Sequence, residues 1–276
     1  MSKITGLRVS MRLQIHHTTQ FHYDEPPSYG LIQLRAAPQS SRAQTVIDWN
    51  IDLEGARQQA RFTDQHGNCV DLIEVLPESH MLEIGVSGEI DTLSSDGVFG
   101  LHQQSMPLWF YRRQSQLTTP TEDLLSLADS IVLPSENTLA DLHALSQLIL
   151  DRVAYVTGET GVATTAGDAW RDAKGVCQDH AHIFLSVVRH KGFPARYVSG
   201  YLLMDDRTSQ DASHAWAEVY LDGLGWVGFD VSNGISPDQR YVRIAQGTDY
   251  ADAAPTRGLT LGAGRENLIV SIQVQQ

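Results

Sequence analysis

The segment from Gly167 to Gly192 places a cysteine at the start of a predicted helix, and it constrains the fold more than any other feature of the sequence. Apolar residues recur at helical spacing after Cys177, at Ala181, Phe184, Leu185 and Val188. Gly192, followed by Phe193-Pro194, predicts the end of the helix. The thiol is therefore expected at the positive end of the helix dipole, which favours the thiolate. This arrangement predicts a nucleophile, although a lone cysteine can also be a small apolar core residue.

A second segment, Ser213–Asp230, predicts two strands joined at an Asp-Gly turn. His214 lies near the start of the first strand, and Asp230 ends the second. A nucleophilic thiol needs a base within hydrogen-bond reach, and the base needs a third group that holds its tautomer. A histidine or an aspartate alone in such places is more often structural. Together with Cys177, however, the two residues predict a catalytic triad.

The triad also predicts the geometry of this hairpin. His214 and Asp230 can meet only if their side chains leave the same face of the sheet. In an antiparallel pair of strands, the numbers of any two residues that face each other add up to the same sum. His214 and Asp230 share a face only if this sum is even. A plain two-residue turn at Asp222-Gly223 gives an odd sum, whereas a three-residue loop gives an even one. We therefore predict an odd loop, or an equivalent bulge, between Tyr220 and Trp226.

Four motifs resemble the core of the bacterial transglutaminase-like superfamily and occur in the order of that family: Gly175-Val-Cys-Gln-Asp-His-Ala181, Gly192-Phe-Pro-Ala-Arg-Tyr-Val-Ser-Gly-Tyr201, Ser213-His-Ala-Trp-Ala-Glu-Val-Tyr220 and Gly225-Trp-Val-Gly-Phe-Asp230. Two more stretches, Arg12–Tyr23 and Tyr250–Gly258, resemble the subgroup with an N-terminal β domain. The resemblance implies a papain-like core with Cys177, His214 and Asp230 as the catalytic residues. The chain departs from the family at Val231-Ser232-Asn233, where relatives commonly carry Pro-Thr-Asn.

The periodicity of the remaining chain predicts an α+β protein in two parts. Apolar and polar residues alternate in short runs from Arg12 to about Asp91, which predicts an antiparallel β-sandwich over residues 11–95. Helical patterns begin at Thr121 and Thr138, before the cysteine helix. Residues 96–276 therefore predict a papain-like catalytic domain in which the nucleophile helix packs on an antiparallel sheet. A last strand closes the chain, and the sequence leaves open which sheet it joins.

Three further residues are candidates for substrate or oxyanion contacts: Trp170, His180 and Trp216. Each residue can instead have a purely structural role: the tryptophans can anchor the core, and His180 can make a polar contact within the core. The backbone N–H of Cys177 at the helix start is the expected oxyanion donor. The sequence assigns no second donor.

Neither a metal nor a cofactor is expected. The histidines near the N-terminus include neighbours on opposite sides of a strand, and His182 points away from Cys177 and His180 on the helix, so neither group has the arrangement of a zinc site. The other cysteine, Cys69, is expected to be reduced and buried in a strand.

Composition argues against several classes of partner. The net charge of -13, from 20 Lys+Arg against 33 Asp+Glu, disfavours binding to nucleic acid. No run of 18 apolar residues predicts a membrane span. The first ten residues lack the apolar region of a secretory signal and are expected to be poorly ordered, so we expect a cytoplasmic protein.

Two classes of function remain open. The first is a thiol-dependent enzyme that transfers the acyl group of a peptide or amide to water, as a protease or amidase, or to an amine, as a transglutaminase. Hydrolysis is the first expectation, although the sequence does not decide between water and amine. The second is a binding or scaffold protein that keeps the fold without turnover. The oligomeric state is open.

Overall fold

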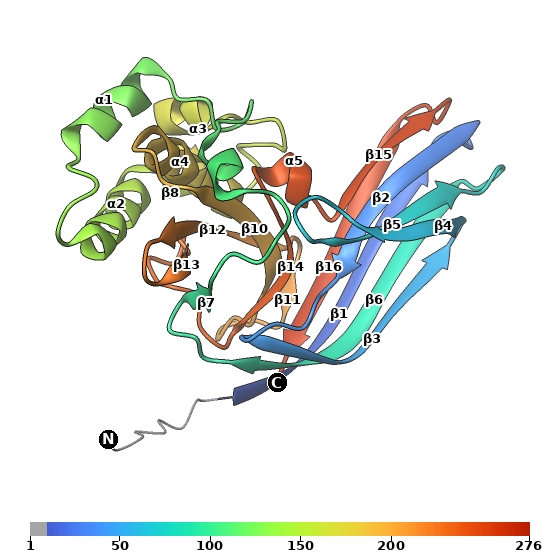
Figure 1. The fold of residues 1–276 in the computed structure, drawn as a ribbon. Helices are drawn as coiled ribbons and strands as arrows, with labels where there is room; N and C mark the ends of the chain where they lie inside the picture. Colours follow the sequence, from blue (N-terminus) through green and yellow to red (C-terminus); the bar gives the residue numbers. More distant parts are fainter. Residues whose placement is uncertain (1–9) are drawn as a thin grey trace.

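The computed structural model describes residues 10–276. The expectation that the first ten residues are poorly ordered concerns residues 1–9, which lie outside this range. The N-terminal part contains two antiparallel sheets, which form separate layers on the right of Figure 1. One has the strand order β11-β16-β1-β6-β3 and the other β15-β2-β5-β4. Their N-terminal strands are β1 (Ser10–Tyr23), β2 (Tyr29–Ala37), β3 (Gln44–Glu54), β4 (Ala56–Thr63), β5 (Cys69–Val75) and β6 (Met81–Leu93).

The alternation of apolar residues explains why these sheets pack face to face. Leu82 and Ile84 of β6 are buried in one apolar cluster with Ile32 of β2 and Ile73 of β5. Because side chains alternate between the faces of a strand, each sheet supplies every second residue to this core. The predicted N-terminal antiparallel β architecture is confirmed. Cys69 begins β5 as predicted for a strand residue, but it is only partly buried.

Strands from the end of the chain complete both N-terminal sheets. β16 (Glu266–Gln275) pairs with β1 from Gln14↔Gln275 to Tyr23↔Glu266, and β15 (Thr256–Leu261) pairs with β2. The short β11 (Ser209–Gln210) pairs with the outer edge of β16. The chain therefore returns to its N-terminal part after residue 255. Alternation could not show this, because it specifies which face of a strand is buried and not which strand lies beside it.

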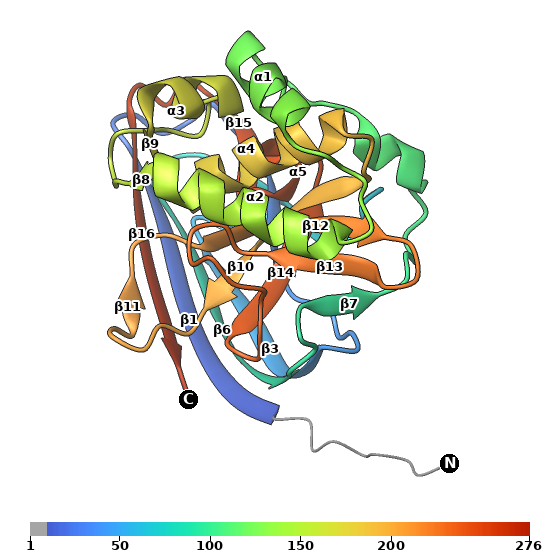
Figure 2. The same cartoon turned by 90° about the vertical axis from the view of Figure 1, so that its left-hand side faces the viewer.

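The second part is a sheet of order β14-β10-β12-β13-β7 covered by helices. In Figure 2 the helices α1, α2 and α3 surround α4, which packs on β10 and β12. Helices predicted from Thr121 and Thr138 are confirmed, whereas the short α3 and α5 were not predicted. No helix in residues 10–276 has the length and apolar character to cross a membrane. The elements are β7 (Val98–Gly100), η1 (Leu108–Arg112), α1 (Glu122–Ser130), α2 (Thr138–Arg152), β8 (Ala154–Tyr155), α3 (Ala166–Asp172), β9 (Lys174–Gly175), α4 (Cys177–His190), β10 (Ala195–Leu202), β12 (His214–Leu221), β13 (Gly225–Phe229), β14 (Tyr241–Gly247) and α5 (Tyr250–Ala253).

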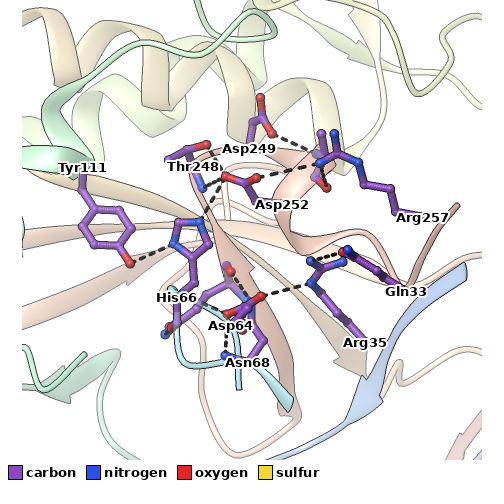
Figure 3. Close-up of polar contacts among 12 residues, drawn as sticks. Gln33, Arg35, Asp64, His66, Asn68, Tyr111, Thr248, Asp249, Asp252 and Arg257 are labelled. Atoms are coloured by element: carbon purple, nitrogen blue, oxygen red, sulfur yellow. Dashed lines mark hydrogen bonds and ion pairs between the residues drawn. The ribbon is translucent and has the colours of Figure 1, made fainter. Parts of the chain in front are cut away.

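Buried polar contacts join the two parts (Figure 3). His66, in the loop between β4 and β5, is 1% exposed. Its Nδ1 lies 3.1 Å from the Tyr111 hydroxyl and its Nε2 lies 3.2 Å from Oδ2 of Asp252 in α5. Asn68 of the same loop donates to the carbonyl of Gln246 in β14 at 2.7 Å. The N-terminal part thus holds α5 and the end of β14, the segment that places Tyr250 beside the cleft described below.

Candidate active site

Cys177 is the first residue of α4 and lines a cleft of about 1060 Å³. The Asp179 carboxylate, in the first turn of the helix, accepts hydrogen bonds from the Val176 N–H at 2.8 Å and from Thr160 Oγ1 at 2.7 Å. An acidic side chain at this position satisfies a free backbone N–H and complements the helix dipole. A Cβ on Gly175 would lie 2.6 Å from the Asp179 Cβ, so this turn requires glycine. These contacts fix the backbone that presents the thiol.

The hairpin of β12 and β13 brings His214 and Asp230 together. Leu221 faces Gly225, so a three-residue loop joins the strands, as predicted. Gly223 and Gly225 have φ angles of 84° and 87°, in the region that favours glycine. His214 Nε2 lies 2.6 Å from Asp230 Oδ2. The predicted register and the predicted contact are both confirmed.

Asp230 is fully buried and is held by three residues. Besides His214, its Oδ2 accepts hydrogen bonds from the Tyr241 hydroxyl at 2.6 Å and from Asn233 Nδ2 at 2.7 Å, and Oδ1 accepts from the Asn233 N–H at 3.2 Å. Burial by itself would raise the pKa of Asp230, but the charge and hydrogen bond of His214, followed by the bonds from Tyr241 and Asn233, lower it. The carboxylate therefore stays ionised and fixed in orientation.

His214 is poised as an imidazolium. Burial disfavours its charged form, but the Asp230 charge and hydrogen bond and a side-chain hydrogen bond to Cys177 outweigh burial and raise the pKa of His214 to about 10. Because Nε2 faces Asp230, Nδ1 is the ring nitrogen left for the Cys177 side chain. The structure thus brings the three predicted residues together in the order thiol, imidazole and carboxylate. This arrangement can hold a thiolate beside an imidazolium.

Both parts of the chain match known families. Residues 125–231 match the Transglutaminase-like superfamily, and residues 13–91 match the Bacterial transglutaminase-like N-terminal region. The chain carries a transglutaminase-like core.

Similar proteins share nearly the whole chain. An uncharacterized protein of Mycobacterium leprae is 27% identical over 275 residues, covering 95% of this chain and 98% of its own. An uncharacterized protein of Mycobacterium tuberculosis is 28% identical over 292 residues, covering 95% of this chain and 91% of its own. The crystal structure of a "Putative Cysteine Protease" from Cytophaga hutchinsonii is similar with a TM-score of 0.77 and 21% identity, covering 98% of this chain and 92% of its own. The two-part fold is therefore shared over its full length.

The three further candidates lie outside the lining of the cleft in the transglutaminase-like core. Trp170 lies at a separate depression beside α2, where the Cζ atom of Arg152 stacks 4.2 Å from the centroid of the tryptophan ring. His180 is buried, with Nδ1 2.9 Å from the Ser232 hydroxyl and Nε2 2.9 Å from a backbone carbonyl. Trp216 stacks on His214 at 6.4 Å between ring centroids. Periodicity put them near the site but could not show which layer of side chains lines it, and their contact with substrate stays a prediction.

Sequence reasoning missed two tyrosines of the transglutaminase-like core, Tyr155 and Tyr241. Tyr241 reaches Asp230 because β14 pairs with β10, and Tyr155 reaches the cleft because β8 pairs with β9. Neither pairing has a local sequence signal. Asn233 could have been found, because an Asn three residues after an Asp can donate back to its carboxylate. Residues 10–276 contain no group of three or more His, Cys, Asp or Glu side chains arranged to hold a metal ion.

Proposed function

We propose that the protein is a thiol-dependent acyl-transfer enzyme that acts on peptide or amide bonds. Cys177 is the nucleophile, His214 the general acid and base, and Asp230 the group that orients and stabilises the imidazolium. The observation that carries the proposal is the buried 2.6 Å contact between His214 and Asp230 next to a thiol that lines an open cleft. A structural cysteine needs neither the ion pair nor the cleft.

The reaction follows from the positions of these groups. The Cys177 sulfur attacks the carbonyl carbon, and the π electrons of the carbonyl move to its oxygen, which lies near the free N–H groups at the start of α4. As the C–N bond breaks, His214 gives its proton to the leaving amine, and an acyl thioester remains. The acceptor then attacks the thioester carbonyl while His214 takes its proton, and the thiolate leaves.

The exposed rim of the cleft supports water as the acceptor. Its rim includes the exposed residues Asp205 and Asp206, in the loop between β10 and β12. Water can therefore enter the cleft, whereas selective transfer to an amine requires a site that excludes water. We accordingly propose a peptidase or amidase, with amine transfer as the second candidate.

The test is turnover of a library of peptides and glutamine amides, with and without an added primary amine. We expect release of amine and formation of carboxylic acid with the wild type and with Cys69→Ala, and no product with Cys177→Ala. Cys69 is the matched control because it lies in β5, in the N-terminal sheets. Amide products that depend on the added amine would identify a transglutaminase instead. No turnover of any member by the folded wild type would contradict the enzyme and favour a binding or scaffold protein.

A further inference from the structure

Only one backbone donor at the start of α4 was assigned to the oxyanion from sequence, and the structure brings a side chain to the same place. β8 lies beside β9 in Figure 2, and the two strands are parallel, with Tyr155 paired to Gly175. The Val156 N–H donates to the Gly175 carbonyl at 2.9 Å, and the Ala154 N–H donates to the Ala173 carbonyl at 3.0 Å. These bonds fix the backbone of Tyr155 beside the residues that lead into Cys177.

The side chain of Tyr155 extends into the cleft with Cys177. Its ring meets that of His180 edge to face, with 6.1 Å between centroids, which holds it over the first turn of α4. The residue is 52% exposed, so a bound substrate can reach it. The Cys177 side chain and the Cys177 backbone are both among the groups that shift the pKa of the Tyr155 hydroxyl. The hydroxyl therefore lies in the same cleft as the thiol, near the N–H expected to bind the oxyanion.

Tyr155 keeps its proton at neutral pH. Partial burial of the hydroxyl, then the charge and side-chain hydrogen bonding of Cys177, raise the pKa of Tyr155 to about 12, although the Cys177 backbone acts in the opposite direction. The group is thus a hydrogen-bond donor to an anion rather than a base.

Three other polar side chains near the thiol, those of Ser232, Asn233 and Gln178, have their own partners. The Ser232 hydroxyl lies 2.9 Å from His180 Nδ1, and the Asn233 amide donates to Asp230 at 2.7 Å. The Gln178 amide points to the carbonyls of Gly161 and Val162, each at 3.5 Å. Tyr197 also lines the cleft and lies near the Cys177 charge, but its ring is buried against His182 and Tyr250, whereas Tyr155 is exposed to a bound substrate.

We propose that the Tyr155 hydroxyl is the second oxyanion donor, and that it donates to the Cys177 thiolate before the attack. The inference rests on the acyl-transfer function proposed above. As the sulfur bonds to the carbonyl carbon, negative charge moves from sulfur to the carbonyl oxygen, and the hydroxyl turns to follow it. The O–H bond stays intact, and the proton for the leaving amine comes from His214.

This arrangement accelerates the reaction because an alkoxide oxygen accepts a hydrogen bond more strongly than a thiolate does. Loss of one oxyanion donor lowers kcat by about 10²- to 10³-fold in general. Part of that loss is offset here, because the resting thiolate loses the same donor. We expect Tyr155→Phe to lower kcat by about 10²-fold and to change KM little.

The test compares wild type, Tyr155→Phe and Tyr29→Phe, a matched control on β2 in the N-terminal part. It measures kcat and KM on an active amide and the affinity for a peptide aldehyde, which Cys177 attacks to form a thiohemiacetal whose oxygen occupies the oxyanion site. We expect Tyr155→Phe alone to lose about 10²-fold in kcat and a similar factor in aldehyde affinity, with an unchanged melting temperature. Alkylation of Cys177 by iodoacetamide at pH 6 should also slow.

Two results would overturn the inference. If Tyr155→Phe slows alkylation but keeps wild-type kcat and aldehyde affinity, the hydroxyl serves the thiolate alone. If all three measurements match the wild type, the hydroxyl has neither role. A wild type with neither turnover nor an aldehyde adduct shows instead that the acyl-transfer function fails, and the inference falls with it. Failure of the inference and failure of the function are thus distinguishable.

Discussion

Replacing Asp230 with asparagine removes one charge from the buried site with little change in shape. Asp230 Oδ2 accepts from His214, Tyr241 and Asn233, whereas Oδ1 accepts the Asn233 N–H at 3.2 Å. The asparagine oxygen is best placed at the Oδ2 position, because the opposite orientation would set its NH2 group against three donors. The NH2 group of the asparagine then takes the Oδ1 position, where it faces the Asn233 N–H at 3.2 Å. His214 keeps its hydrogen bond but loses the anion.

The size of the effect follows from the pKa of His214. Pairing raises it from 6.5 to about 10, and Asp230 is the first of the groups that raise it. Without that charge most of the rise is lost, so the imidazolium that protonates the leaving amine is scarce at pH 7. We expect kcat/KM at pH 7 to fall by about 10²- to 10⁴-fold, the range in which loss of a triad carboxylate acts.

The assay is kcat/KM between pH 6 and 10 for the wild type and Asp230→Asn, with the melting temperature of each. The control is Asp48→Asn, which removes an exposed carboxylate from β3 and should leave the rate unchanged. A loss smaller than about tenfold in a folded Asp230→Asn variant would refute the reasoning and make Asp230 a structural residue.

Three further outcomes are expected. Cys177→Ala should abolish turnover yet change the free energy of unfolding by only about 1 to 2 kcal/mol, and wild-type turnover would exclude Cys177 as nucleophile. Pairing with Asp230 raises the pKa of His214 from 6.5 to about 10. The protonated pair therefore stabilises the fold fully below pH 6.5, and this contribution to the free energy of unfolding is lost as pH rises through about 10. Urea titrations should therefore show that the difference in unfolding free energy between wild type and His214→Gln becomes smaller as pH rises over that window. A difference that becomes larger as pH rises would contradict the ion pair. Glu218→Gln should lower the free energy of unfolding by about 3 to 5 kcal/mol, because it removes the negative charge that pairs with Arg243 and with the buried Arg196 guanidinium, 2.7 Å from the carboxylate. A loss below about 1 kcal/mol in urea titrations would show that the pair is not needed.

Local patterns were sufficient to predict the elements that carry the three residues of the proposed triad. The spacing after Cys177 predicts α4, and the parity of residue numbers predicts the loop that brings His214 to Asp230. Both depend on neighbours in sequence, namely one helical face and one hairpin. That is why they could be derived before any coordinates.

Contacts between distant segments could not be derived in the same way. Tyr155 and Tyr241 complete the site through strand pairings of β8 with β9 and of β14 with β10. β16 joins β1 although the chain between them spans the whole second part. The buried contact of His17 with Tyr201, at 2.8 Å, likewise depends on how the two parts pack. The alternation of apolar and polar residues predicts each strand, but it does not indicate which other strand lies beside it.

The contact between the two parts bears on the site as well as on stability. His66 and Asn68 hold the segment that ends in α5, and the Tyr250 N–H at the start of α5 donates to His182 Nε2 in α4 at 3.1 Å. Tyr250 also lines the cleft. The N-terminal sheets therefore support one wall of the candidate active site.

The central claim is that Cys177 is a nucleophile activated by His214, and the rate of iodoacetamide alkylation at pH 6 tests it most directly. Cys69 serves as the internal control, because burial raises the pKa of its thiol. Peptide mapping by mass spectrometry reads both cysteines in one sample. The account predicts that Cys177 is alkylated at least about 10²-fold faster than Cys69, and that His214→Gln removes most of this difference. Equal rates at the two cysteines, or a Cys177 rate that His214→Gln leaves unchanged, would contradict it.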